Sequence, residues 1–234
     1  MDSQNTSFRK KITILTGAGI SAESGLKTFR DANGLWEGHD VMAVASPEGW
    51  QKDQELVLDF YNQRRKQLLR VKPNPAHEAL VKLEQKYDVT IVTQNIDNLH
   101  EKAGSAKVLH LHGELLKVRS TLNENYTVDW TEDLHTGDCC PAGSQLRPHV
   151  VWFGEDVPKL EEAVMITAQA DHIIIIGTSM QVYPAASLIN FAKENAQVYF
   201  IDPKPSILPG KNLEILATTA SAGVPIVVDR LLSN

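Results

Sequence analysis

Short apolar runs rich in isoleucine and valine recur along the chain, and polar residues rarely interrupt them. They cover residues 12–15, 89–93, 108–111, 150–153, 172–176, 198–201 and 226–228. Strands that are covered by helices on both faces lack the polar alternation of half-exposed strands. The pattern therefore predicts a buried, mostly parallel β-sheet.

Stretches with apolar residues at helical spacing lie between several of these runs. The spacing is clearest over residues 53–70, 76–86 and 160–170. Alternation of strands with helices is typical of doubly wound α/β proteins. We therefore expect an α/β fold, a Rossmann-type parallel sheet with helices on both faces.

Two connections, residues 31–74 and 114–148, are too long for simple crossovers. The first contains the expected helix 53–70, and the second is polar and rich in turn residues. Long insertions on a compact scaffold usually form lids or binding loops. We expect a single catalytic domain over residues 1–234, in which a helical insert at 31–74 and a second insert at 114–148 form a small lobe beside a cleft.

Charge and composition narrow the possible partners. The chain has 234 residues and a formal net charge of −6. Phosphate neutralisation needs a basic face, so we expect no direct nucleic-acid partner, whereas lysine-rich protein segments remain suitable. Residues 1–11 resemble neither a secretory signal nor a transit peptide. With no apolar run near the roughly 20 residues that cross a bilayer, we expect a cytoplasmic protein that binds no membrane. A monomer is expected, because no oligomerisation element stands out.

A glycine-rich turn follows the first apolar run directly, formed by Gly17, Ala18, Gly19, Ile20, Ser21 and Ala22. Missing side chains allow backbone N–H groups to approach a pyrophosphate at a helix N-terminus. Alone, the motif is equally compatible with an ordinary tight turn between strand and helix. The acidic residue that a dehydrogenase carries after its second strand is not at the usual place, which argues against hydride transfer.

Five linked segments give the chain a resemblance to the sirtuin family. They are the segment from Gly17 to Arg30, residues 93–100, residues 110–114, residues 151–155, and residues 177–179 followed by 182–185. Their order and spacing match the family's pattern from about residue 11 to the C-terminus. The resemblance implies an NAD-dependent protein-lysine deacylase that consumes NAD as co-substrate and acts on acylated lysine side chains of proteins.

The resemblance also assigns cofactor-binding residues by position. They are Gly17, Ala18, Gly19, Ile20, Ser21, Ala22, Glu23, Phe29, Arg30, Trp36, Gln94, Asn95, Ile96, Asp97, Gly177, Thr178, Ser179, Asp202 and Ala220. The stretch from Gly17 to Trp36 is expected to wrap the pyrophosphate and cover the nicotinamide. Asp202 stands where sirtuins more often have asparagine, and a carboxylate still accepts hydrogen bonds from ribose hydroxyls.

His112 and Asn95 are the catalytic residues that the resemblance implies. The acyl-lysine oxygen attacks the ribose as nicotinamide leaves, and a base near neutral pKa then activates a ribose hydroxyl to attack the imidate. Two residues earlier, His110 is expected to be a packing residue rather than a second base. Two alternatives remain, protein ADP-ribosyl transfer and a non-catalytic NAD sensor, and the intact histidine segment favours deacylation over both.

Tyr61 and Arg64 lie three residues apart, on one face of the expected helix. The commoner fate of such a pair is an amphipathic helix with a solvated arginine. The same spacing resembles the class III sirtuins, which remove succinyl, malonyl or glutaryl groups, and this implies that Arg64 binds a terminal carboxylate. Removal of acetyl groups is expected to coexist. Val151, Phe153 and Gly154 are the expected substrate-binding residues, on an edge strand that an extended peptide joins.

The chain departs from the family at the small lobe. Most sirtuins bind zinc there with four cysteines in two pairs, whereas this chain has Arg119-Ser120 where the first pair begins and retains Cys139 and Cys140. His135 and Asp138 are close in sequence, but the required ligand set is absent, so we expect no bound metal. Residues 122–130 are expected to form a small hairpin instead, with Tyr126 and Trp130 in its core.

Overall fold

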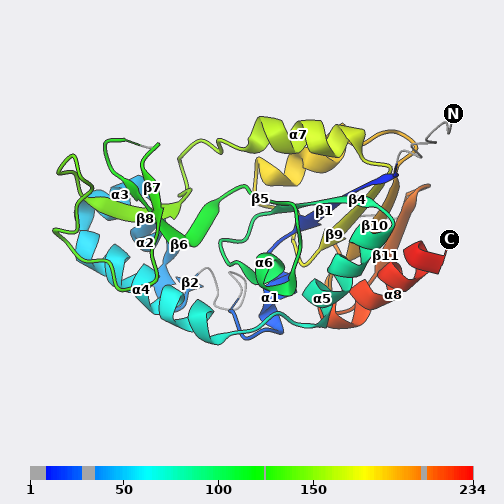
Figure 1. The fold of residues 1–234 in the computed structure, drawn as a ribbon, viewed down its shortest axis with the longest axis horizontal. Coiled ribbons are helices and arrows are strands. Elements are labelled where there is room, and N and C mark those ends of the chain that lie inside the picture. Colours follow the sequence, from blue (N-terminus) through cyan, green and yellow to red (C-terminus); the bar gives the residue numbers. More distant parts are fainter. Residues whose placement is uncertain (1–8, 28–34, 124, 207–209, 234) are drawn as a thin grey trace, which may run out of the picture.

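The computed structural model describes residues 9–27, 35–123, 125–206 and 210–233. Its centre is a parallel six-stranded sheet in the order β11-β10-β9-β1-β4-β5 (Figure 1). The strands are β1 (Lys11–Thr16), β4 (Asp88–Thr93), β5 (Val108–His110), β9 (His172–Ile176), β10 (Gln197–Ile201) and β11 (Leu213–Leu216). The order reverses between β1 and β9, as in the dinucleotide-binding α/β fold. The predicted fold class is confirmed.

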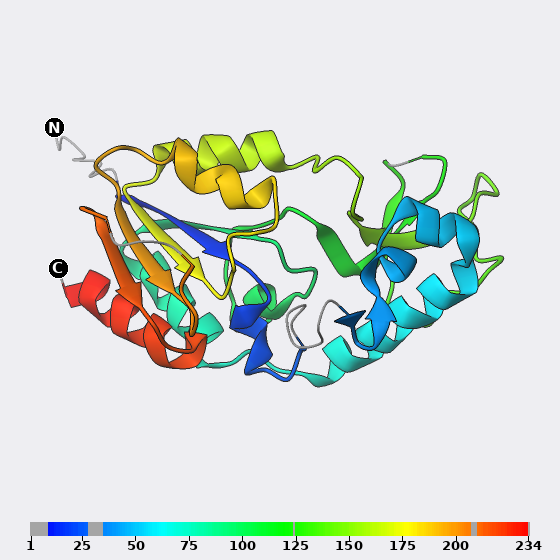
Figure 2. The ribbon, with the colours of Figure 1, turned by 180° about the vertical axis from the view of Figure 1, so that it is seen from behind.

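Helices cover both faces of this sheet. Alternate residues such as Ile12 and Ile14 pack against α5 (Pro75–Lys82) and α8 (Ala220–Ser233). On the opposite face, residues such as Leu15 pack against α7 (Leu160–Gln169) and the 3₁₀ helix η2 (Ala185–Phe191). Figure 2 shows the sheet between these two layers from behind. Burial on both faces explains why the strands are almost continuously apolar.

A second core lies at the other end of the molecule, on the left in Figure 1. Both inserts contribute to it. After α1 (Gly19–Ala22), the first insert contains β2 (Leu35–Trp36), β3 (His39–Asp40), α2 (Val41–Val44), α3 (Pro47–Lys52) and α4 (Gln54–Arg70). An antiparallel sheet follows β5, in the order β7-β6-β8, with β6 (Gly113–Ser120), β7 (Thr127–Asp129) and β8 (Leu146–Val150). We propose that both inserts form one lobe of a single catalytic domain.

The expected helices agree with the structure closely. Asp53 caps α4 by accepting a hydrogen bond from the Leu56 N–H at 2.9 Å. The expected helix 76–86 ends earlier, at Lys82, and continues as the 3₁₀ turn η1 (Leu83–Gln85). The remaining short helix is α6 (Leu99–Ala103). Within the residues described above, no helix is long and apolar enough to span a bilayer.

Two of the expected strands are wrong. Residues 226–228 lie within α8, because Val224, Val227, Val228 and Leu231 recur at helical spacing and form its buried face. The sheet edge is instead β11, which no apolar run predicts. The run at 150–153 is also not a strand of the main sheet, because β8 ends at Val150 in the antiparallel sheet. A short apolar run does not distinguish a strand from a buried helix or loop.

Candidate active site

The candidate site residues gather where five parallel strands end. Gly17 follows β1, Gln94 and Asn95 follow β4, His112 follows β5, Gly177 follows β9, and Asp202 follows β10. In open α/β sheets, ligands bind at the carboxyl ends of the strands, beside the point where the strand order reverses. Here that point lies between β1 and β9, at Gly17 and Gly177.

Three glycines allow the first and last motifs to touch. The Gly19 N–H donates to the Gly177 carbonyl at 2.8 Å, and the Gly17 N–H donates to the Ile176 carbonyl at 3.0 Å. A Cβ on Gly19 would lie 2.6 Å from the Gly177 Cα, and Gly177 itself has a φ of +59°. Two segments that are far apart in the sequence therefore form one continuous backbone surface.

A buried hydrogen-bond network joins the first two sirtuin-like segments. The Asn95 Nδ2 donates to the Gly17 carbonyl and to the Ser21 hydroxyl, each at 3.2 Å. The Ser21 hydroxyl in turn donates to the Asp97 carboxylate at 2.9 Å. Burial raises the pKa of Asp97, and hydrogen bonds from the Leu99 N–H and the Ser21 hydroxyl oppose this rise. The network fixes the orientation of the Asn95 and Asp97 side chains.

His112 has the geometry of a general base. Its Nδ1 lies 3.0 Å from the Gln94 carbonyl oxygen. A carbonyl only accepts, so Nδ1 carries the hydrogen and the lone pair of the neutral ring is on Nε2. Burial lowers the pKa of His112, and the hydrogen bond to Gln94 only partly offsets this effect. His112 is therefore neutral at neutral pH, with Nε2 able to accept a proton.

His110 is more than the packing residue that the sequence suggests. Its Nδ1 lies 2.9 Å from the Asn95 carbonyl oxygen, and its Nε2 lies 2.8 Å from the Glu101 carboxylate. Both partners only accept, so both ring nitrogens carry hydrogens and His110 is a cation. Burial acts to lower the pKa of His110, but the hydrogen bond and ion pair with Glu101 raise it overall. His110 thus holds the backbone of Asn95 beside the base.

The remaining expected cofactor residues lie around the same edge. Gln94 donates to the Thr178 hydroxyl at 3.2 Å, and the Glu23 carboxylate accepts from the Ser221 N–H at 2.8 Å, next to Ala220 at the start of α8. Asp202 is buried, and its carboxylate accepts the Lys204 N–H at 2.8 Å.

One expected cofactor residue of the described structure, Trp36, lies away from the strand ends of the main sheet. Trp36 packs edge-on against Phe60 of α4, with ring centroids 5.0 Å apart, and so lies against the small lobe. Phe29 and Arg30 lie outside the described residues.

Tyr61 and Arg64 line the small lobe from α4. Tyr61 is fully buried, and its hydroxyl accepts a hydrogen bond from the Trp152 Nε1 at 2.9 Å. The Arg64 guanidinium stacks over the Phe60 ring, 4.6 Å from its centroid, and its Nη2 lies 3.8 Å from the Glu37 carboxylate. Its Nε and Nη1 are buried, and neither has a hydrogen-bond partner among the residues that the structure describes. Arg64 is therefore not the solvated arginine of the alternative interpretation.

The segment from Val151 to Glu155 connects the two regions. The Val151 N–H donates to the His112 carbonyl, and the Phe153 N–H donates to the Ala45 carbonyl, each at 2.9 Å. Nearby, the Leu115 N–H donates to the Ile96 carbonyl at 2.8 Å. The expected substrate strand is thus a loop at Phe153 and Gly154, and β8 before it is the edge strand of the small sheet.

The small lobe does not offer the donor set of a four-thiolate zinc site. The hydroxyls of Ser120 and Ser144 lie 2.6 Å apart, and the Cys140 sulfur lies 3.0 Å from the Ser144 hydroxyl. Cys139 is exposed, and the Asp138 carboxylate accepts the His135 N–H at 2.7 Å in a turn. One thiol and two hydroxyls that bond to one another do not fit a tetrahedral zinc site.

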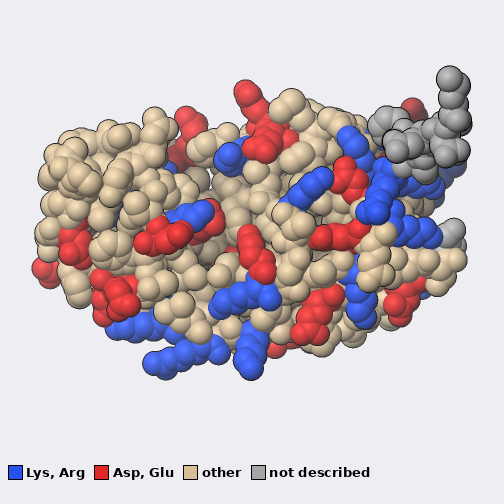
Figure 3. Space-filling view, viewed as in Figure 1, with Lys and Arg blue, Asp and Glu red and all other residues tan. Residues whose placement is uncertain are grey.

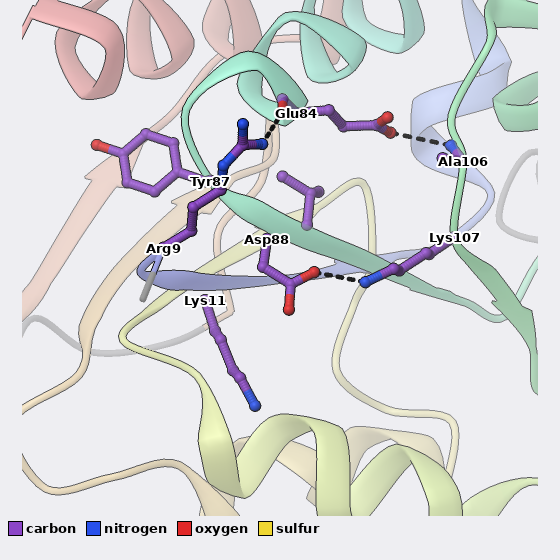
Figure 4. Close-up of a pocket in the computed structure, with 8 residues that line it drawn as sticks. Arg9, Lys11, Glu84, Tyr87, Asp88, Ala106 and Lys107 are labelled. Carbon is purple, nitrogen blue, oxygen red and sulfur yellow. Dashed lines mark hydrogen bonds and ion pairs between the residues drawn. The ribbon is translucent and has the colours of Figure 1, made fainter. Parts of the chain in front are cut away.

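A hollow of about 430 Å³ lies at the opposite edge of the main sheet (Figure 4). Lys11 and Asp88, at the amino ends of β1 and β4, line it together with Glu84 and Lys107. An ion pair of 2.6 Å joins Lys107 to Asp88 across it. Because ligands of α/β sheets bind at the carboxyl ends of the strands, we do not assign the cofactor to this hollow.

Comparison with known proteins agrees with this geometry. A model of the Sir2 family matches residues 17–184. An NAD-dependent protein deacylase of Helicobacter pylori is 62% identical over 195 residues, which are 83% of this chain and 85% of that protein. Another, from Bacteroides thetaiotaomicron, is 51% identical over 222 residues, 92% of this chain and 95% of that protein. The crystal structure of a Sir2 homologue in complex with NAD is 36% identical, with a TM-score of 0.86 over 96% of this chain and 90% of that one. The chain therefore belongs to the Sir2 family.

Proposed function

We propose that this chain is an NAD-dependent protein-lysine deacylase in which His112 is the general base. The observation that carries the proposal is the 3.0 Å hydrogen bond from His112 Nδ1 to the Gln94 carbonyl. It places the hydrogen on Nδ1 and leaves Nε2 as the basic nitrogen, in a residue that follows β5 at the same sheet edge as Gly17 and Gly177. The relatives from Helicobacter pylori and Bacteroides thetaiotaomicron are NAD-dependent protein deacylases, which supports the same activity.

The residues of the site divide the work between them. NAD supplies the ribose that receives the acyl group, and nicotinamide is the leaving group. Asn95 and Asp97, held by Ser21, orient the nicotinamide ribose and the carboxamide. His112 accepts a proton from a ribose hydroxyl, so that this oxygen attacks the imidate formed by the acyl-lysine oxygen. The lysine amine then leaves and one water molecule is consumed, so that the products are free lysine, nicotinamide and O-acyl-ADP-ribose.

We further propose that acyl groups ending in a carboxylate, such as succinyl or malonyl, are substrates beside acetyl. The side chain of Arg64 is 13% exposed and has two buried nitrogen atoms without a partner. Buried donors without acceptors are costly, and a ligand carboxylate satisfies one of them together with Nη2 in a bidentate pair. The Glu37 carboxylate lies 3.8 Å from Nη2, so a bidentate ligand carboxylate would compete with it at that nitrogen.

The protein partner is proposed to be an extended acyl-lysine segment along β8 and the loop at Phe153. The net charge of −6 suits lysine-rich segments. Acidic and basic side chains intermix over the face in Figure 3, which supports the prediction that nucleic acid is not a partner. A monomer in the cytoplasm that binds no membrane stays a prediction.

The deciding experiment incubates the protein with NAD and matched acetyl-lysine or succinyl-lysine peptides, and follows the products by mass spectrometry. His112→Ala is expected to lower turnover by about 10²–10⁴-fold, the usual contribution of a general base, while NAD still binds. His135→Ala, which changes an exposed histidine of the small lobe, is the matched control. Wild-type protein that removes neither group in the presence of NAD would refute the proposal.

Arg64→Met tests the acyl class separately. It is expected to reduce removal of succinyl groups far more than removal of acetyl groups, and equal effects would reject the carboxylate-binding role. The same experiment distinguishes ADP-ribosyl transfer, because that reaction leaves ADP-ribose on the protein acceptor and the acyl-lysine unchanged. The base at His112 favours deacylation, since the imidate step needs it.

A further inference from the structure

We infer that Trp152 is a positioning residue for the selection of acidic acyl groups, and that it acts through the hydroxyl of Tyr61. The inference rests on the proposed function, because it concerns Tyr61 and Arg64 of α4, the acyl-binding wall of the small lobe. Trp152 lies in the loop between the candidate peptide-binding residues Val151 and Phe153, and its indole donates a hydrogen bond to the Tyr61 hydroxyl.

The contact between Trp152 and Tyr61 determines how the tyrosine hydroxyl is used. The Trp152 Nε1 lies 2.9 Å from the Tyr61 oxygen, and both side chains are almost completely buried. An indole N–H only donates, so the Tyr61 oxygen is the acceptor of this bond and its own hydrogen is directed elsewhere. In the part of the chain that the structure describes, that hydrogen has no acceptor.

The buried hydroxyl is thereby prepared as a donor. Burial raises the pKa of Tyr61 far above neutrality, despite the opposing hydrogen bond from Trp152, so the phenol keeps its proton. A donated hydrogen bond also polarises the O–H group and strengthens its next bond in the chain. A carboxylate is the strongest acceptor that a substrate acyl group presents to such a donor. An acetyl group has no acceptor at that end.

Trp152 is itself held rigidly by charged groups. The Arg147 guanidinium stacks on the indole ring, 3.3 Å from its centroid. The Glu155 carboxylate accepts the Trp152 backbone N–H at 2.8 Å and a hydrogen bond from Arg147 at 2.6 Å. Arg119 adds a further hydrogen bond to Glu155 at 3.2 Å. The indole therefore has one orientation, and the loop that carries Phe153 is coupled to the acyl-binding wall.

The test is Trp152→Phe, measured as kcat and KM for matched succinyl-lysine and acetyl-lysine peptides. We expect the succinyl-to-acetyl ratio of kcat/KM to fall by about threefold to tenfold, the usual effect of one hydrogen bond. The fall is expected in KM rather than kcat. Trp50→Phe makes the same change of indole to phenyl in the ring that packs 5.7 Å from Trp152, and should leave the ratio unaltered.

A double-mutant cycle identifies the route of the effect. If Trp152 acts through the Tyr61 hydroxyl, the ratio in Trp152→Phe/Tyr61→Phe equals that in Tyr61→Phe alone. Replacing Trp152 by benzothienylalanine, which exchanges the N–H for sulfur and keeps the ring shape, gives the same fall in a protein whose core stays filled. Additive effects, or an unchanged ratio in the sulfur variant, overturn the inference. Tyr61→Phe and Arg64→Met that leave the ratio intact indicate instead that the proposed acyl class is wrong.

Discussion

The candidate site has two walls, the edge of the main sheet and the small lobe, and their polar groups are satisfied in different ways. At the edge of the main sheet, Asn95, Ser21 and Asp97 bond to one another and to the backbone. On the small lobe, Arg64 has buried nitrogen atoms without a partner. A network that is complete within the protein holds its groups in place before a ligand arrives. A wall with unsatisfied donors leaves part of its hydrogen bonding to the ligand. The first arrangement suits chemistry common to all substrates, and the second suits discrimination between them.

The largest expected effect comes from disturbing the edge of the sheet. Gly19→Ala places a Cβ about where the Gly177 backbone lies, with the Gly177 Cα only 2.6 Å away. Neither loop has a flexible side chain that can move aside, so both backbones must shift. We expect NAD affinity to fall by at least about 100-fold, because the backbone N–H groups no longer converge on the pyrophosphate. Calorimetric titration with NAD measures this directly.

Gly210→Ala is the control for this substitution. Among the described residues, its Cβ would meet the Leu213 Cβ at 3.7 Å, which is ordinary contact. NAD affinity should stay within about twofold of the wild type, the range of a surface substitution. If Gly19→Ala binds NAD normally, the contact between the two loops is not what organises the edge.

A substitution on the small lobe, by contrast, is expected to improve the binding of one class of substrate. Glu37→Gln removes the carboxylate that lies 3.8 Å from Arg64 and competes with a carboxylate on the substrate. We expect the KM for succinyl-lysine peptides to fall by about threefold to tenfold and that for acetyl-lysine peptides to change little. Glu37 has a φ of +52° in the two-residue turn between β2 and β3, where glycine or asparagine is usual. The strained position is consistent with a selected role beside Arg64.

Lys27→Gln separates this effect from the other ion pair of Glu37. Lys27 lies 3.1 Å from the Glu37 carboxylate and is 66% exposed. Its loss should leave the succinyl-to-acetyl ratio unchanged. A higher succinyl KM in Glu37→Gln would show that Glu37 orients Arg64 for the ligand rather than competing with it.

A smaller effect is expected in the pH dependence of kcat/KM, which depends on His112 at the sheet edge. Burial lowers the pKa of His112 below 6.5, so its neutral, basic form persists to more acidic pH than that of an exposed histidine. As pH falls, kcat/KM should therefore decline only below 6.5. An acetyl-lysine peptide is the suitable substrate, because it adds no carboxylate that titrates. A decline centred above 6.5 would contradict a buried, neutral base.

The sequence predicts the edge of the sheet better than the small lobe, for a physical reason. Gly17, Asn95, His112 and Gly177 each lie within two residues of a strand end, and the ends of parallel strands necessarily meet at one edge. The pair of Trp152 and Tyr61 joins positions 91 residues apart through packing between a loop and a helix. No periodic pattern records such a contact. The same holds for the strand run at 226–228, where tertiary packing turned apolar residues into the buried face of α8.

The sequence also does not predict the raised pKa of His110. His110 and His112 are two positions apart, and the sequence around them does not show that their ionisation differs. Their partners distinguish them, since Glu101 lies 2.8 Å from His110 and raises its pKa, whereas the partner of the His112 ring in the described structure is a backbone carbonyl. A glutamate nine positions before a histidine carries no recognisable signal, because the pairing depends on how α6 lies against β5.

The smallest expected effect concerns metal removal. The Ser120, Ser144 and Cys140 side chains bond to one another in the small lobe, so we expect no structural metal there for a chelator to withdraw. We expect treatment with a chelator to leave the melting temperature and the deacylase activity unchanged, and elemental analysis to find no stoichiometric zinc. Ser144→Ala should instead destabilise the protein by about 1–3 kcal/mol, because it leaves buried partners unsatisfied. Thr136→Ala, at an exposed position in the same lobe, should have little effect. A melting temperature that falls by several degrees on chelation would mean that the small lobe depends on a metal. The core of the small lobe, like Arg64 of α4, would then need a bound ligand to satisfy its polar groups, whereas the sheet edge would not.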